Sequence, residues 1–231
     1  MSVEVSQYEI NVHLYKTLEE IRTRTPLYLK TPSITELRMF LNGFFTAWDT
    51  FDVKVVWDTL IPLPFGCFTN YVACRLGSDG SPGWWRIILN ETAQDEEKGF
   101  QLFYMLLEEF KQLRISKCFA ADLSDSNIAY HISDECLVKN LTGEHWDVRE
   151  PVYKNPVKVW YAELIDDAEH KSYIGVVETD TESLISGLPW KLFRTEKDIL
   201  ADFKMYFGTI AWQKQNQKNI EIRSRDPILE A

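Results

Sequence analysis

The chain of 231 residues is 45% hydrophobic and 13% aromatic, so it holds enough apolar material for a packed core and lacks the composition of a disordered chain. Its formal net charge of −10 opposes binding to nucleic-acid phosphates and to anionic membrane surfaces. No stretch approaches the roughly 20 consecutive apolar residues of a membrane-spanning helix, and the first residues lack the layout of a secretory signal. We therefore expect a cytoplasmic protein that binds neither nucleic acid nor membranes.

Helical periodicity dominates the chain up to about residue 115. The spacing of apolar residues predicts a helix from Tyr8 to Arg24, which Thr25-Pro26 should end because proline disfavours helical geometry in the residue before it. Ser33 and Glu36 form a capping box for a second helix. We expect a broad buried face on this helix, with Phe40 and Phe44 in the core, made of Ile34, Leu37, Phe40, Leu41, Phe44, Phe45 and Trp48.

Glycine and acidic residues give further information about the helices. Gly43, inside the second helix, indicates the close approach of another backbone. Residues 65–76 favour a helix over a strand, and Gly77 should end it in the left-handed conformation. Another helix follows the acidic triplet 95–97, which complements the positive end of the helix dipole. Its core stripe consists of Phe100, Phe103, Leu106, Leu107 and Phe110.

The second half of the chain has a different character. Residues 116–123 read as a strand and residues 124–150 as polar and irregular. The β-rich runs 157–165 and 172–179 predict a hairpin, and Thr195 with Asp198 predicts a capped late helix that Gly208 ends. The fold class is therefore α+β: a helical N-terminal half, residues 1–115, packed on a mixed C-terminal half, residues 116–231, as one compact unit.

Four possible zinc ligands lie between residues 118 and 145: Cys118, His131, Cys136 and His145. Structural zinc sites usually bring ligands in short pairs, but here 12, 4 and 8 residues separate successive candidates. Buried thiols and surface histidines explain them better, and no phosphate-binding glycine loop or hydrolase motif occurs elsewhere. We predict no catalysis and no cofactor. A zinc- or cysteine-dependent hydrolase using residues 118–145, or a small-ligand sensor, is the alternative.

The predicted hairpin is acidic, because residues 157–182 contain seven acidic residues and two basic ones. Such a surface can dock a basic partner through long-range steering and complementary pairs. Alternatively, the charges only protect a solvated sheet edge from aggregation. The candidate partner-binding residues are Glu163, Asp166, Asp167, Glu169, Glu178 and Asp180.

Residues 21–47 and a second block, GWWRIIL followed by DEEKGFQLFYMLLEEF, resemble a pattern in immunity proteins of bacterial polymorphic and contact-dependent toxin systems. The matching residues of the first block are Ile21, Arg24, Pro26, Tyr28, Leu29, Ser33, Ile34, Leu37, Phe40 and Gly43. The departures are Thr25 between Arg24 and Pro26, Lys30 in place of glycine, and Phe44 after Gly43. The resemblance covers residues 8–115.

This resemblance implies a role in bacterial competition. An immunity protein is a cytoplasmic antidote that binds the C-terminal domain of a cognate toxin and has no catalytic activity. The acidic balance of this chain would suit a basic toxin domain. The matching motifs are structural in character, so the resemblance implies a scaffold for the helical half and names no binding residue.

Overall fold

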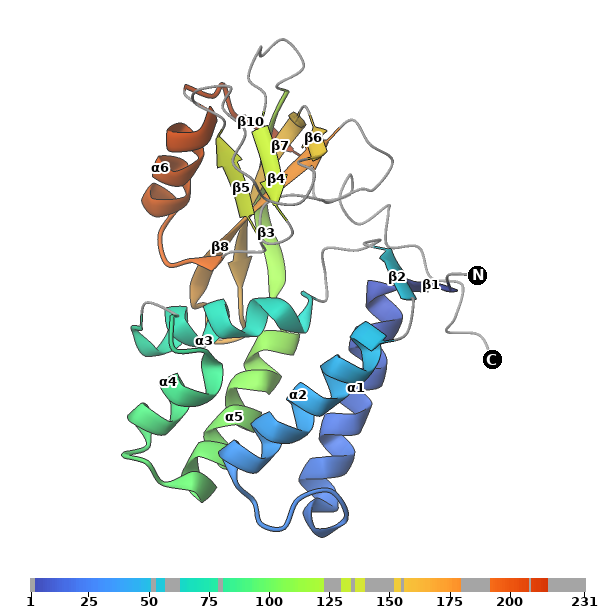
Figure 1. Ribbon diagram of the computed structural model, residues 1–231. Coiled ribbons are helices and arrows are strands. Elements are labelled where there is room, and N and C mark those ends of the chain that lie inside the picture. Colours follow the sequence, from blue (N-terminus) through green and yellow to red (C-terminus); the bar gives the residue numbers. More distant parts are fainter. Residues whose placement is uncertain are drawn as a thin grey trace, which may run out of the picture. The chain divides into compact units, whose positions relative to one another are not determined.

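The computed structural model describes residues 3–50, 53–56, 63–78, 81–122, 130–133, 136–139, 152–154, 156–179, 192–207 and 209–215 (Figure 1). The chain divides into two compact units, Met1–Leu113 and Arg114–Ala231. The first is built of helices and the second around an antiparallel sheet, which confirms the predicted α+β class. No helix in the described ranges is long and apolar enough to cross a membrane.

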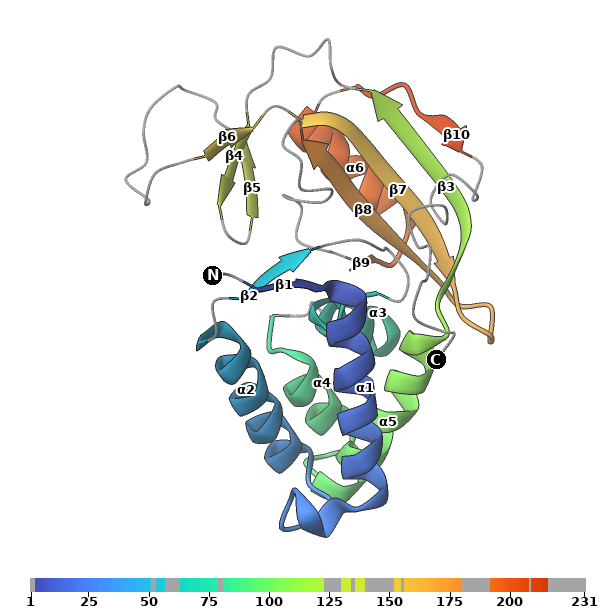
Figure 2. The ribbon, with the colours of Figure 1, turned by 90° about the vertical axis from the view of Figure 1, so that its right-hand side faces the viewer.

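The first unit contains five α-helices among its described residues (Figure 2). They are α1 (Gln7–Thr23), α2 (Ile34–Thr50), α3 (Phe68–Leu76), α4 (Trp84–Glu91) and α5 (Glu96–Lys111). Short 3₁₀ turns at Thr25–Leu27 and Phe65–Cys67 lead toward α2 and α3. Gly77 ends α3 with φ of 78°, as predicted from its freedom to adopt the left-handed conformation.

Three elements of this unit were not predicted one by one. Helix α4 follows Gly83 directly, in a part of the chain that was expected only to be largely helical. Strands β1 (Val3–Ser6) and β2 (Val53–Val56) form a small parallel pair on either side of α1 and α2 in the chain. Both are short, and short segments give too few repeats for periodicity to identify them.

The core of the first unit is aromatic. The Phe68 side chain is completely buried, and its ring lies 5.2 Å from that of Phe65, 5.3 Å from that of Phe103 and 5.4 Å from that of Phe110, centroid to centroid. These contacts join the start of α3 to the core stripe of α5. Helix α5 also packs against α2 and α4. The apolar stripe predicted for α5 is buried at Phe100, Phe103, Leu106, Leu107 and Phe110.

The buried face of α2 is narrower than predicted. Ile34, Leu37 and Leu41 are buried, whereas Phe40 and Phe44 are only half-buried. The ring of Phe40 meets that of Tyr28 edge-on at 5.9 Å, so it covers the chain that leads into α2 and does not enter the core. The prediction that both rings are core residues is therefore wrong. Neighbouring helices cover one side of α2, and three residues at helical spacing fill that side.

The expected close backbone approach at Gly43 is also wrong. Gly43 is exposed, and a Cβ atom placed there would meet nothing within 4 Å. Gly99 in α5 is a position where close packing favours glycine, because a Cβ atom there would lie 3.1 Å from Ile34 Cγ2. Helix α2 thus packs against α5 at Gly99 and not through its own glycine.

Replacement of Gly43 by alanine is expected to raise the free energy of unfolding by about 0.5–1 kcal/mol, because alanine loses less backbone entropy in a helix interior. Denaturant unfolding of the two proteins measures the change. The same replacement at Gly99 serves as the comparison and should give no gain, since Ile34 must move to accept the methyl group. Loss of stability at position 43 would contradict the exposed placement of this glycine.

The second unit is organised around a five-stranded antiparallel sheet in the order β10-β3-β7-β8-β9. Its strands are β3 (Arg114–Asp122), β7 (Pro156–Ile165), β8 (Lys171–Thr179), β9 (Leu192–Phe193) and β10 (Gln213–Gln215). Strands β7 and β8 form the predicted hairpin. A three-stranded sheet contains β4 (Tyr130–Ser133), β5 (Cys136–Lys139) and β6 (Val152–Lys154). Strands β4 and β5 fall within residues 124–150, which were expected to be irregular.

Helix α6 (Glu196–Phe207) packs on one face of the five-stranded sheet. The packing core consists of Ala121, Val159, Tyr161, Tyr173, Ile199 and Phe203. Gly175 in β8 allows this close approach, because a Cβ atom there would lie only 2.9 Å from the Phe203 ring. The Thr195 hydroxyl accepts a hydrogen bond from the Asp198 amide at 3.2 Å, as expected of the helix cap. Gly208, the predicted end of the helix, lies outside the described residues.

Candidate functional site

Glu163 is a buried carboxylate in the middle of the acidic hairpin. Glu163 is only 5% exposed, although the charge pattern of the sequence predicted that it belongs to an exposed docking surface. Ser116 in β3 donates a hydrogen bond to one carboxylate oxygen, and Tyr173 in β8 donates one to the other at 3.0 Å. The ammonium groups of Lys117 and Lys171 both lie 3.4 Å from that second oxygen. Glu163 therefore joins three strands and does not offer a free carboxylate.

The environment of Glu163 stabilises its charged form. Burial alone would raise the pKa of this carboxyl group, but the hydrogen bonds from Ser116 and Tyr173 and the charges of the two lysines outweigh it and lower the pKa to about 2. Burial and the hydrogen bond to Glu163 raise the pKa of Tyr173 to about 12. Glu163 is thus ionised and Tyr173 protonated at neutral pH, an arrangement that suits a structural charge network.

Asp166 holds the hairpin turn together from inside. It is 1% exposed, and its carboxylate accepts a hydrogen bond from the His170 amide at 2.8 Å and contacts the His170 ring nitrogen Nδ1 at 3.0 Å. Its carbonyl oxygen accepts from the Glu169 amide at 3.1 Å. The turn gives Glu169 a φ of 62°, in the left-handed region. Asp166, like Glu163, therefore stabilises the hairpin and is not part of an exposed docking surface.

The exposed carboxylates of the turn are those of Asp167 and Glu169. Asp167 forms an ion pair with Arg114 at 2.8 Å, and both side chains are about 60% exposed. Glu178 lies opposite Lys158 in the β7–β8 register, and its side chain lies outside the described part of the structure. Asp180 also lies outside it. The candidate docking surface thus narrows, among the described side chains, to Asp167 and Glu169.

Basic residues from β3 offset much of the charge of the hairpin. Arg114 and Lys117 precede Asp167 and Glu163, the residues that they contact, by 53 and 46 residues in the chain. Antiparallel pairing of β3 with β7 brings them together. A count of charges along residues 157–182 omits them. The end of the hairpin is therefore a mixed-charge surface with exposed acidic groups at its turn.

The four zinc candidates are not gathered into a site by the described part of the structure. Cys118 is buried in β3, and its thiol points toward the Phe119 carbonyl oxygen at 3.9 Å. His131 and Cys136 belong to β4 and β5, but their side chains and the whole of His145 lie outside the described residues. Among the residues that are described, no group of three or more His, Cys, Asp or Glu side chains could hold a metal ion.

The two sequence blocks of the first unit meet at Glu96. Its carboxylate accepts hydrogen bonds from the Ser33 hydroxyl at 2.7 Å, the Thr35 amide at 3.0 Å and the Thr35 hydroxyl at 2.7 Å. Ser33 still caps α2, since its hydroxyl oxygen accepts from the Glu36 amide at 3.1 Å. Glu36 turns instead to the Lys30 amide at 2.6 Å. One carboxylate from α5 thus binds an amide in the first turn of α2. The Ser33 amide, which Glu36 was predicted to bind, donates instead to the Thr31 carbonyl oxygen at 2.8 Å.

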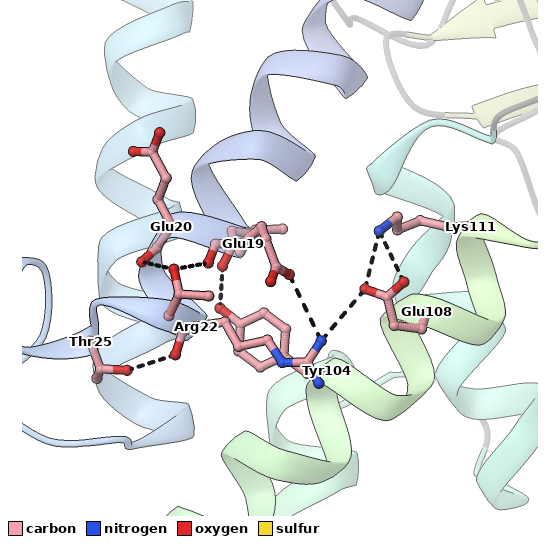
Figure 3. Close-up of polar contacts among 9 residues, drawn as sticks. Glu19, Glu20, Arg22, Thr25, Tyr104, Glu108 and Lys111 are labelled. Carbon is pink, nitrogen blue, oxygen red and sulfur yellow. Dashed lines mark hydrogen bonds and ion pairs between the residues drawn. The ribbon is translucent and has the colours of Figure 1, made fainter.

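A second polar network joins α1 to α5 (Figure 3). The Arg22 guanidinium lies 5.3 Å from the Tyr104 ring centroid and 3.8 and 3.9 Å from the carboxylates of Glu19 and Glu108. Lys111 completes the series with an ion pair to Glu108 at 3.0 Å. The network contains two positive and two negative side chains, so its charges balance. We therefore interpret it as a structural link between α1 and α5. Sequence spacing alone could suggest only the pairs within a helix.

Comparisons with protein-family models, with curated proteins and with solved structures find no match to this chain.

Proposed function

We propose that this protein is an immunity protein, a cytoplasmic antidote that binds the C-terminal domain of a cognate bacterial toxin and blocks it without catalysing a reaction. The observation that carries the proposal is the junction of the two resembling blocks. Ser33 and Thr35 of the first block bind Glu96 of the second, and Ile34 packs against Gly99. The residues that resemble immunity proteins are thus residues that stabilise the fold. This favours a scaffold shared with those proteins, in which exposed loops bind the partner.

The toxin-binding face in this proposal is the turn of the β7–β8 hairpin. Glu178 pairs with Lys158 at the other end of the hairpin and is therefore not part of this face. Asp167 and Glu169 are its exposed carboxylates, and Glu163 and Asp166 hold the turn from beneath. A turn fastened by buried hydrogen bonds presents its exposed groups with little loss of conformational entropy on binding. Its acidic groups suit a basic toxin surface, which they would steer toward the antidote.

Co-production with the toxin domain encoded beside its own gene tests the proposal. The natural protein should protect the cells and form a stable complex with the purified toxin domain. The double variant Asp167→Lys/Glu169→Lys should keep its melting temperature but associate more slowly and with a weaker dependence on salt, because exposed charges act mainly on the association rate. Each exposed pair contributes only about 0.2–1 kcal/mol, so both charges are reversed together.

The matched control is Glu91→Lys/Glu97→Lys, which changes the net charge equally at two exposed residues of the first unit. Association of the control should resemble that of the natural protein. Failure of the natural protein to protect cells would contradict the immunity function. Protection with unchanged association of the Asp167 and Glu169 variant would leave that function standing and move the binding face elsewhere.

A further inference from the structure

Two arginines in the first unit share one tryptophan ring. The guanidinium carbon of Arg38, from α2, lies 4.2 Å from the Trp85 ring centroid, and that of Arg86, from α4, lies 5.0 Å from it. Trp85 and Arg38 are half-buried, and Arg86 is exposed. A guanidinium that stacks on an aromatic face keeps the N–H donors at its edge free for a further partner.

In the described part of the chain, neither Arg38 nor Arg86 forms an ion pair with a carboxylate. Three other arginines do: Arg22 lies between two carboxylates in Figure 3, Arg75 binds Glu109 at 2.9 Å, and Arg114 binds Asp167. The chain has 35 acidic residues and 25 basic ones, so carboxylates are plentiful. Two like charges held beside one ring, with no carboxylate paired to them among the described residues, favour an anion from outside.

The cluster is held in place by backbone features of both helices. Gly83 precedes α4 with φ of 80°, a conformation that favours glycine, and Trp85 lies in the first turn that follows. On the other side, Glu96 binds Thr35, which precedes Arg38 by one helical turn. The side chains thus come from helix starts that are already fastened, so their ordering costs little when a partner binds.

We propose that Arg38, Trp85 and Arg86 form a docking surface for an acidic segment of a partner protein, with carboxylates bound by the edges of the two guanidinium groups that the indole holds in place. Tryptophan and arginine are the residue types that most often dominate protein interfaces. Two arginines match one or two carboxylates in paired hydrogen bonds. Nucleic acid is disfavoured as the occupant because its binding needs an extended basic surface, and this chain carries a net charge of −10.

Fluorescence anisotropy with a fluorescein-labelled octaglutamate peptide tests the proposal on the full chain at low and at physiological salt. The natural protein should bind the peptide, and Arg38→Gln/Arg86→Gln should weaken binding about tenfold or more, since hydrogen bonds to charged groups are lost. Trp85→Phe should weaken it less, because a phenyl ring attracts cations less strongly than an indole. Melting curves show whether each variant is folded.

The matched control is Arg24→Gln/Lys30→Gln, which removes two exposed positive charges from the same unit. Equal weakening by this control would overturn the proposal, because net charge and not the cluster would then govern binding. Absence of peptide binding by the natural protein would overturn it too. A labelled single-stranded oligonucleotide that binds through Arg38 and Arg86, where octaglutamate does not, would assign the cluster to polyphosphates. None of these outcomes depends on the immunity function or on the hairpin.

Discussion

Replacement of Phe68 by alanine is expected to lower the free energy of unfolding by about 3–5 kcal/mol, the range for removing a fully buried aromatic ring. Phe68 has no exposed surface and touches the rings of Phe65, Phe103 and Phe110. Truncation would leave a cavity between α3 and α5, lined by rings that have little freedom to close it. Urea unfolding followed by tryptophan fluorescence reports on this region, because Trp84 lies 6.1 Å from Phe68.

Met105→Ala is the matched control for this measurement. Met105 lies on α5, the helix that supplies Phe103 and Phe110, but it is 54% exposed. Its truncation should change the free energy of unfolding by no more than about 0.5 kcal/mol, as is usual for surface substitutions. Equal effects at positions 68 and 105 would mean that the aromatic cluster is not the core of the first unit.

Replacement of Glu163 by glutamine is expected to lower the free energy of unfolding at neutral pH by about 1–3 kcal/mol, the cost of disturbing a buried, charge-assisted hydrogen-bond network. Glutamine keeps one acceptor oxygen for Ser116 or Tyr173 but places an N–H₂ donor among groups that are themselves donors. The charge that faces Lys117 and Lys171 is also lost. Urea unfolding of both proteins measures the difference.

The effect of Glu163 should depend on pH in a defined direction. Its pKa in the folded protein, about 2, is below the ordinary value of 4.5, so the unfolded state binds the proton more tightly. The stability from this carboxylate is fully present above about pH 4.5 and is lost as pH falls toward 2. The natural protein should therefore lose its advantage over Glu163→Gln across this range. Glu169→Gln, exposed in the same hairpin, is the control; identical pH profiles for the natural protein and Glu163→Gln would contradict the network.

Features that depend on neighbours a few positions away could be predicted from the sequence. The left-handed end of α3 at Gly77 needs only a glycine, and the Asp95 cap of α5 needs only the Lys98 amide, 3.0 Å from its carboxylate. The β7–β8 hairpin also follows from local alternation and a polar turn. In each case the deciding hydrogen bonds lie within the element itself.

The width of a buried face could not be predicted in this way. Periodicity shows which residues of α2 share a side, and it placed Phe40 and Phe44 beside Ile34 and Leu37. Which of them is buried depends on how far the neighbouring helices extend around α2. The packing of α4 and α5 against α2 decides that, and these helices cover a narrower stripe at Ile34, Leu37 and Leu41.

The sequence by itself determined the α+β class, the main helices and the hairpin, because hydrophobic period and capping residues act over one or two turns. Only the tertiary structure decided which charges are free. Residues from β3 and β8 form hydrogen bonds with Glu163, and the first turn of α2 forms hydrogen bonds with Glu96 of α5. Arg38 of α2 stacks on Trp85 of α4. Electrostatic interactions depend on distance in space, and a charge count along the chain omits that distance. Among the described side chains of the acidic segment, the fold buries Glu163 and Asp166 and exposes Glu169 and Asp167, the latter paired with Arg114.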